Sequence, residues 1–310
     1  MIPLKSNEIF GNWATLLLPV NKDSSIDYET LGLEIDILIG MGVNGIYSNG
    51  TAGEFYNQTE KEFDAISTLL ADKCNAAQMP FQLGCNHMSP VVSLERLRRA
   101  IHLQPGAVQV ILPDWFPPTM EENIDFLKRM AELAGDIGII LYNPPHSKVR
   151  LQPHDFETMR EAGVRLVGCK LAGGDENWYL DMKKHAPDLS LFIPGHHLAT
   201  GILLGANGAY SNVACLHPGA AQQWYDMMAP DMDAALELQG RIQLFMNDQI
   251  VPFIRDKKYS NQAADKFMAA VGGWMDIHPR LRWPYKGIEQ EEVQSTRQSA
   301  KKILPEFFKN

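Results

Sequence analysis

One lysine lies in an otherwise uncharged, largely apolar segment of the chain. The segment LVGCKLA covers residues 166–172, with Lys170 near its end. Such a run is typical of a buried parallel strand, where lysine is rare unless it is paired or used chemically. Apolar surroundings lower the pKa of an amine, and a neutral amine attacks a ketone to form a Schiff base. The alternative is a lysine at a strand end whose ammonium group reaches water.

Two further segments carry groups that suit such chemistry. Tyr142 in LYNPPHSKV ends the preceding predicted strand and can exchange protons with an imine; the alternative is a core tyrosine. In SNGTAGEF, the backbone amides of Gly50, Thr51 and Ala52, with the Thr51 hydroxyl, can bind a carboxylate. The alternative there is an ordinary turn between a strand and a helix.

Polar residues also follow the last two predicted strands. His196 and His197 in IPGHHLATG follow the seventh strand, and Asn212 ends the eighth. Adjacent histidines point in different directions, and neither HxH nor HExxH is present, so we expect substrate contacts rather than a metal site. Plain loop residues are the other possibility. We predict no metal and no cofactor.

The elements that must position these residues alternate between strands and helices. We predict strands at 12–20, 42–51, 80–86, 107–113, 138–144, 165–172, 189–195 and 205–212. This alternation predicts an α/β fold, a (β/α)8 TIM barrel. The runner-up is an open doubly wound sheet, which usually has a glycine-rich turn after its first strand; residues 16–25, LLLPVNKDSS, are not one.

Strand periodicity also predicts which side chains enter the barrel. Alternation places Leu166, Gly168, Lys170 and Ala172 inside, with Val167, Cys169 and Leu171 facing the helices. Lys170 then lies at the C-terminal end of its strand, where barrel active sites are built. From about residue 216 the pattern is wholly helical. We therefore expect a catalytic barrel over 1–230 and a C-terminal helical extension over 231–310.

Composition narrows the possible partners. The formal charge is −9, with 45% apolar and 21% charged residues, which disfavours binding to nucleic acid or to anionic membranes. The four cysteines form no CxxC pair, which indicates reduced thiols and a cytoplasmic location. No apolar run approaches 18 residues, and the N-terminus lacks the apolar region of a signal peptide.

Three motifs in order resemble those of the dihydrodipicolinate synthase / N-acetylneuraminate lyase family of class I Schiff-base enzymes. GTAGE (50–54) is similar to its GTTGE or GSTGE loop, YNPP (142–145) to YNxP, and GCKLAGGD (168–175) to GxKxxxGD. The resemblance covers most of the chain. It implies Lys170 as the Schiff-base lysine, Tyr142 as the acid/base, Thr51 as a carboxylate contact that positions Tyr142, and Gly195 as a pocket residue.

The chain departs from the family at several places. Ala52 replaces a second hydroxyl residue of the loop. Asp114 and Trp115 follow the fourth strand, where the synthases have a tyrosine from a neighbouring subunit. Ser147 lies where the synthases carry an arginine, although Lys148 and Arg150 are close. His196, His197 and Leu198 lie where the neuraminate lyases have an Asp-Glu pair.

These features predict a lyase that acts on pyruvate or another 2-oxo acid. We expect aldol or retro-aldol cleavage, or dehydration, of a 2-keto-3-deoxy sugar acid. Trp115 and Phe116, with His196, His197 and Asn212, would form an aromatic and hydrogen-bonding wall. The alternatives are a dihydrodipicolinate synthase that condenses pyruvate with aspartate semialdehyde, a non-catalytic barrel that binds 2-oxo acids, and, more remotely, a metal-dependent aldolase. By analogy with the family, the protein is expected to be a homo-oligomer, a dimer or a tetramer.

Overall fold

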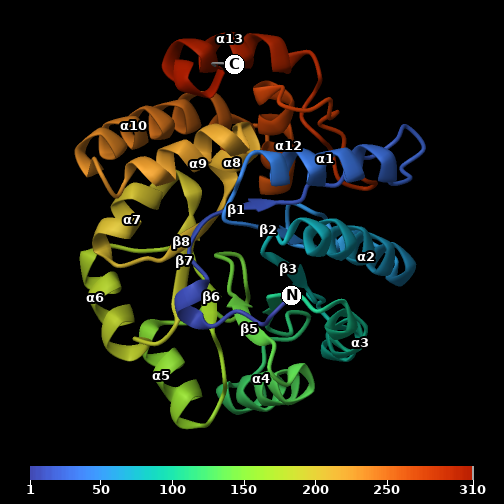
Figure 1. The fold of residues 1–310 in the computed structure, drawn as a ribbon, viewed down its shortest axis with the longest axis vertical. Helices are drawn as coiled ribbons and strands as arrows, with labels where there is room; N and C mark the ends of the chain where they lie inside the picture. The colour runs from blue at the N-terminus through green and yellow to red at the C-terminus, as the bar shows by residue number, and fades with distance from the viewer. Residues whose placement is uncertain (309–310) are drawn as a thin grey trace.

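The computed structural model of the protein describes residues 1–308 and contains a closed barrel of eight parallel strands (Figure 1). The strands are β1 (Gly11–Thr15), β2 (Gly45–Ser48), β3 (Phe81–Gly84), β4 (Ala107–Ile111), β5 (Gly138–Tyr142), β6 (Gly168–Lys170), β7 (Ser190–Pro194) and β8 (Gly208–Ser211). Each strand pairs with its neighbours in chain order, and β8 pairs with β1. The predicted barrel is confirmed, and the open sheet is excluded.

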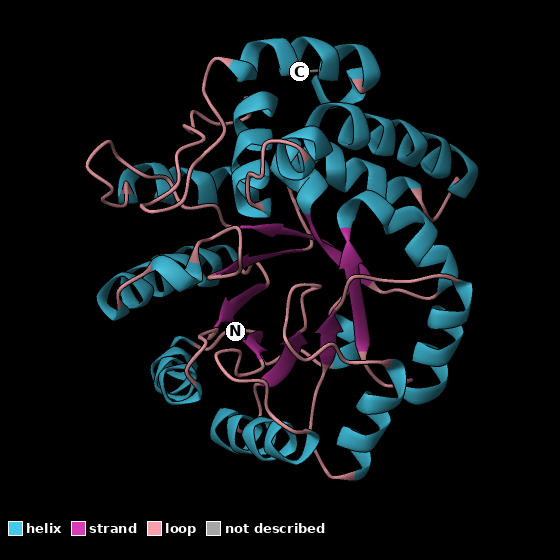
Figure 2. Ribbon diagram, turned by 180° about the vertical axis from the view of Figure 1, so that it is seen from behind, coloured by secondary structure: helices cyan, strands magenta, loops and turns pink. Residues whose placement is uncertain are grey.

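Helices surround the barrel on its outside (Figure 2). They are α1 (Tyr28–Gly40), α2 (Glu60–Ala77), α3 (Pro90–Ala100), α4 (Met120–Ala134), α5 (Pro153–Glu161), α6 (Glu176–His185), α7 (Leu198–Leu204), α8 (Asn212–Leu216) and α9 (Pro218–Met227). All eight strands fall where the sequence predicts them but are shorter. The apolar runs continue into the loops at the mouth of the barrel, where side chains remain buried beyond the ends of the strands; Leu16, Leu17 and Leu18 follow β1 in this way.

Large side chains fill the interior of the barrel. Trp13, Tyr47, Ile140, Phe192 and Tyr210 form an inner cluster, separate from the larger core between strands and helices. The Tyr47 and Tyr210 rings lie 4.5 Å apart. A barrel of eight strands is just wide enough for such filling. Any ligand must therefore bind above this layer, at the ends of the strands.

The segment before β6 does not alternate as predicted. Gly168 and Lys170 face inward, but Leu166 packs against the outer core and Val167 against the inner cluster. The Cβ position of Gly138 on the neighbouring strand lies 2.4 Å from Val167 Cγ2, so the glycine leaves room for this valine. The predicted phase was wrong below Gly168, because residues 165–167 precede the strand and are not held to its pleat.

The C-terminal residues form helices that lie together beside the barrel (top of Figure 1). They are α10 (Met232–Phe245), a π-helical segment η5 (Met246–Ile250), α11 (Val251–Arg255), α12 (Asn261–Gly272) and α13 (Glu292–Ile303). Residues 274–291 contain no helix, which corrects the expectation of a wholly helical extension. Helix α12 is buried along most of its length and contacts α8 and α13.

Candidate active site

A cavity of about 410 Å³ lies at the C-terminal end of the barrel. Lys170, Tyr142 and Thr51 line it together, as the sequence predicts, and so does Ala52. The ends of β5 and β6 supply the first two side chains, and the loop after β2 supplies the other two. Barrel enzymes place their reacting groups at this end of the strands.

Lys170 lies among aromatic rings. Tyr142 and Lys170 are directly paired in the register of β5 and β6, and Lys170 Nζ lies 4.3 Å from the centre of the Tyr142 ring. The same nitrogen lies 3.3 Å from Tyr47 Oη. Burial lowers the pKa of Lys170 to about 8, although the nearby Asp265 carboxylate favours the charged ammonium. A useful share of the amine is therefore neutral near physiological pH.

Tyr142 is coupled to the loop that follows β2. Burial raises the pKa of the Tyr142 phenol, whereas its hydrogen bond with the Thr51 side chain acts in the opposite direction. The hydroxyl thus keeps its proton at neutral pH and is oriented by Thr51. A phenol in this position can donate a proton to an oxygen that leaves the substrate and can later take one back.

The loop that carries Thr51 is strained and firmly held. Asn49 and Glu54 both adopt left-handed backbone conformations, with φ of 53° and 52°; such strain persists only where the surroundings enforce it. The Glu54 carboxylate is fully buried and binds Lys266 Nζ at 2.6 Å. Gly50 does not line the cavity; its Cβ position lies 2.6 Å from Tyr47 Cε2, so the absent side chain lets the loop approach this ring.

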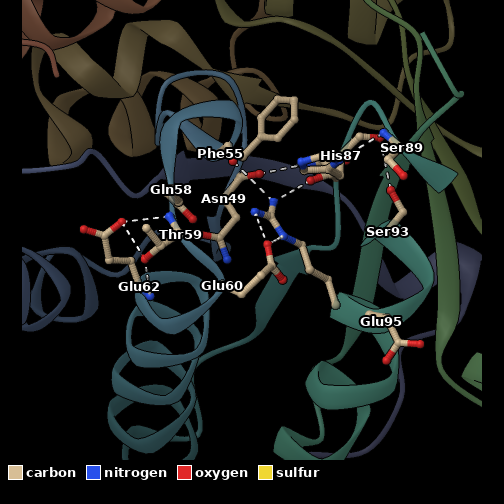
Figure 3. A network of polar contacts seen from close by, with 12 residues as sticks. Asn49, Phe55, Gln58, Thr59, Glu60, Glu62, His87, Ser89, Ser93 and Glu95 are labelled. Carbon is tan, nitrogen blue, oxygen red and sulfur yellow. Dashed lines mark hydrogen bonds and ion pairs between the residues drawn. The ribbon is translucent and has the colours of Figure 1, made fainter. Parts of the chain in front are cut away.

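A second set of contacts holds the end of this loop, and Figure 3 shows Phe55, Thr59, Glu60 and Glu62 in it. The buried Arg96 guanidinium donates to the carbonyl oxygen of Phe55 at 3.3 Å and forms an ion pair with Glu60 at 2.8 Å. Thr59 and Glu62 form a capping box at the start of α2. These bonds keep the strained loop closed against the barrel.

His196, His197 and Asn212 all line the cavity. The Asn212 amide donates to His196 Nδ1 at 2.9 Å, which leaves Nε2 as the hydrogen donor of that ring. Burial lowers the pKa of His196 to about 4, so the ring is neutral. His197 Nδ1 accepts from Gln243 Nε2 at 3.0 Å. Both histidines are thus held as neutral hydrogen-bonding groups.

Two expected pocket residues lie elsewhere. Gly195 does not line the cavity; its Cβ position would lie 2.5 Å from Ser211 Oγ, so it is a close-approach glycine. Trp115 is 83% exposed, outside the cavity, because the loop after β4 turns its ring toward solvent beside the Lys148 ammonium. Among residues 1–308, Trp115 forms no aromatic wall of the cavity. Lys148 and Arg150 are exposed and do not line the cavity either.

Sequence reasoning missed Tyr47 and the whole contribution of the C-terminal helices. Gln243, Met246, Asn247 and Ile250 line the cavity from the end of α10 and from the π-helical segment, and Asp265 lines it from α12. π-Helical turns often occur at functional sites. The signal in the sequence was the adjacent charged pair Asp265-Lys266 inside the helical segment NQAADKFMAAVGG. The helical pattern alone does not indicate which residues would interact with these two charges.

No group of three or more histidine, cysteine, aspartate or glutamate side chains in residues 1–308 is arranged to hold a metal ion. In the same part of the chain, none of the helices combines the length and the apolar character needed to cross a bilayer.

A closed barrel with a lysine and a tyrosine paired at its C-terminal mouth defines a class, the (β/α)8 barrel lyases. Comparison with known proteins gives the family. The dihydrodipicolinate synthetase family matches residues 9–303, and the chain belongs to this family, whose members are class I lyases.

Relatives with different activities are similarly distant. A 4-hydroxy-tetrahydrodipicolinate synthase from Neisseria meningitidis serogroup C / serotype 2a is 28% identical over 87% of this chain and 91% of its own length. An N-acetylneuraminate lyase from Enterobacter sp. (strain 638) is 26% identical over 66% of this chain and 68% of its own length. The crystal structure of YagE, a prophage protein of this family from E. coli K12 in complex with pyruvate, shares the fold, with a TM-score of 0.83 at 18% identity over 95% of this chain and 98% of that one.

Proposed function

We propose that the protein is a class I lyase in which Lys170 forms a Schiff base with the keto carbon of pyruvate or of a related 2-oxo acid. The carrying observation is the Lys170 amine, enclosed by Tyr47, Tyr142 and Tyr210, with a pKa lowered by burial to about 8. The neutral amine adds to the C2 carbonyl, and water leaves from C2 as the C=N bond forms. In this proposal Tyr142 supplies the proton that the departing water needs.

The iminium then acts as an electron sink for the next bond. In the cleavage direction, the C4 hydroxyl loses its proton, C4 becomes an aldehyde carbonyl, and the electrons of the C3–C4 bond move to form an enamine. For dehydration, a proton leaves C3 and hydroxide leaves C4 with a proton from an acid. The backbone amides of Thr51 and Ala52, with the Thr51 hydroxyl, would hold the carboxylate of the 2-oxo acid.

Reductive trapping tests this proposal. The protein is incubated with pyruvate and borohydride, and its peptides are analysed by mass spectrometry. The adduct is expected on Lys170, to be absent from Lys170→Met, and to persist in Lys148→Met, a matched change of an exposed lysine near the mouth. An adduct on another lysine, or none in the unmodified protein, would refute the Schiff-base mechanism.

The synthase activity of one group of relatives is the second candidate. It requires a cation for the carboxylate of aspartate semialdehyde, and Lys170 is the one lysine or arginine among the described residues that line the cavity. Losing a charge-assisted hydrogen bond costs about 1.5–3 kcal/mol, or roughly 10- to 100-fold in preference. The structure thus supports a neutral aldehyde or a 2-keto-3-deoxy sugar acid over this substrate. Turnover of a neutral aldehyde with pyruvate, of a 2-keto-3-deoxy sugar acid or of aspartate semialdehyde with pyruvate would indicate a lyase and would contradict the alternative of a non-catalytic binding barrel.

We also propose an oligomeric state and a cellular location for the protein. Trp115 and Phe116 are 83% and 81% exposed, and large exposed apolar side chains favour contact with another protein surface. We infer a homo-oligomer that covers them. All four cysteines are free and buried, which supports a cytoplasmic protein.

A further inference from the structure

We propose that Asp265 is the catalytic base that takes the C3 proton from a 2-oxo acid bound to Lys170, and that it returns a proton to C3 in the reverse step. This inference rests on the proposed function, because it concerns the imine on Lys170. It deepens that function by assigning the proton transfer at C3 to a residue of the C-terminal helix α12.

Asp265 and Lys170 line the same cavity without contacting each other. The Asp265 carboxylate interacts electrostatically with Lys170, Tyr142 and Cys215, which places it at the reacting end of the cavity. Among residues 1–308, no ion pair or hydrogen bond joins it to Lys170. A small molecule attached to Nζ can therefore occupy the space between the two groups. Only C2 separates C3 of a bound 2-oxo acid from Nζ, so the C3 proton lies beside the amine.

The Asp265 carboxylate is also free of other partners. In the described chain, no hydrogen bond or ion pair links it to another side chain or to the backbone. Burial raises the pKa of Asp265 to about 7, whereas the Lys170 ammonium favours the carboxylate form. A carboxyl group that titrates near neutral pH and has no permanent partner can both take and release a proton, which a base used in both directions must do.

The residue that follows fixes the position of Asp265. Lys266 is fully buried, binds Glu54 Oε1 at 2.6 Å and donates to the Arg280 carbonyl oxygen at 2.8 Å. Successive residues of a helix point about 100° apart. Lys266 therefore anchors α12 to the loop after β2, while Asp265 faces the cavity. The carboxylate is held in place before the 2-oxo acid binds, which favours proton transfer.

The other titratable groups that line the cavity are less suited to this step. His196 Nδ1 accepts from the Asn212 amide, so the free nitrogen of this ring carries a hydrogen and cannot take another at neutral pH. His146 and His197 are exposed to solvent. Burial raises the pKa of the remaining four, which therefore keep their protons at neutral pH: Tyr47, Tyr142, Tyr210 and Cys215.

Tyr142 is the alternative base, because it becomes a phenolate when it gives its proton to the departing water. Burial and the charge of Asp265 both raise the pKa of this phenol. A phenolate and a carboxylate at the same end of the cavity repel each other, so Tyr142 and Asp265 do not both stay deprotonated without cost. In our assignment Tyr142 acts at the C2 oxygen, where Thr51 orients its hydroxyl, and Asp265 acts at C3.

The proposed step conserves atoms and charge. The carboxylate takes the C3 proton, the electrons of the C3–H bond form the C2=C3 bond, and the electrons of the C2=N bond move to nitrogen. The iminium thereby becomes a neutral enamine, and Asp265 becomes a carboxylic acid. In D2O this acid exchanges its proton with solvent, so the reverse step places deuterium on C3.

Pyruvate alone tests the assignment, because its methyl group is C3. The protein is incubated with pyruvate in D2O at a pH above about 8, where the neutral Lys170 amine predominates. Loss of the methyl proton signal is followed by NMR, and borohydride trapping of the same samples gives the amount of imine on Lys170. In Asp265→Asn the imine should still form, while exchange per imine should fall about 10²- to 10⁴-fold, the range typical of general base catalysis.

Three further variants make the test specific. Asp265→Ser removes the carboxylate with a different shape and should show the same loss. Asp276→Asn, a change of an exposed acid, should exchange like the parent. Tyr142→Phe should form the imine more slowly but exchange faster per imine than Asp265→Asn. Both changes at Asp265 should leave the fold intact by circular dichroism, because they remove no hydrogen bond or ion pair of the described chain.

Several results would overturn the inference. One is a loss of exchange in Asp265→Asn smaller than about 10²-fold; another is a folded Asp265→Asn protein that forms no imine. Slower exchange per imine in Tyr142→Phe than in Asp265→Asn would assign the step to the tyrosine instead. Absence of any adduct in the parent refutes the Schiff-base proposal itself, whereas an adduct without methyl exchange in the parent refutes only the role of Asp265.

Discussion

Lys266→Met should destabilise the protein strongly, because Lys266 and Glu54 form a fully buried ion pair. The Lys266 ammonium lies 2.6 Å from Glu54 Oε1, and Glu54 Oε2 accepts from the Arg282 backbone N–H at 3.0 Å. Methionine fills a similar volume but leaves the carboxylate buried with only that one backbone donor. Removing one partner of a buried pair typically costs about 3–5 kcal/mol.

The expected shift in melting temperature follows from the size of the chain. An unfolding entropy of about 2.1 cal/mol/K per residue gives roughly 0.65 kcal/mol/K for a chain of this length. A loss of about 3–5 kcal/mol therefore lowers Tm by about 5–8 °C. The change should also reach the active site, since the pair joins α12 to the loop that carries Thr51.

Calorimetry or thermal unfolding followed by circular dichroism measures the shift. Two further variants make the test specific. Glu54→Gln combined with Lys266→Met removes both charges and should recover at least half of the lost stability, because no uncompensated buried charge remains. Lys257→Met breaks an exposed ion pair with Glu292 and should change the stability by under about 1 kcal/mol. A Lys266→Met protein that melts within about 1 °C of the parent, or a double variant no more stable than Lys266→Met, would refute the reasoning.

Two further predictions concern catalysis. Tyr142→Phe removes a hydroxyl that we assign to proton transfer, so turnover should fall about 10²- to 10⁴-fold with the fold intact by circular dichroism; near-normal turnover would mean that Tyr142 only packs. The rate of pyruvate trapping should rise with pH and level off above about 8, because burial lowers the pKa of Lys170 to about 8 and the neutral amine predominates only above it. In Asp265→Asn the midpoint should move to lower pH, since the lost carboxylate favours the charged ammonium; an unshifted midpoint, or one near the ordinary lysine value in the parent, would contradict this assignment.

The barrel is the part of the fold that the sequence predicts best. Strand–helix alternation predicts all eight strands, because a parallel strand buried on both faces must be a short apolar run between helices. Lys170 stands out for the same reason, as a charge in such a run. Its pairing with Tyr142 follows from two motifs at the ends of adjacent strands, which parallel pairing brings to one edge.

Side-chain direction in loops could not be predicted in this way. Trp115 and Gly195 occupy positions at the catalytic end of the barrel, yet Trp115 turns to solvent and Gly195 lies against Ser211. A strand fixes the direction of each side chain through its pleat, whereas a loop does not. The break in alternation at Val167 has the same origin.

The sequence by itself predicted the barrel and the family, and it singled out Lys170 and Tyr142 as the candidate reacting pair. Only the tertiary structure decided what else surrounds them. Asp265 lies 95 residues after Lys170 in the chain, inside helix α12. The apolar pattern of this helix predicts that the helix is buried, but it does not predict the surface against which the helix packs. The position of α12 over the barrel depends on the ion pair between Lys266 and Glu54 and on the contacts of α12 with α8. Contacts between distant segments are set by shape and charge complementarity in three dimensions, which a local periodicity cannot encode.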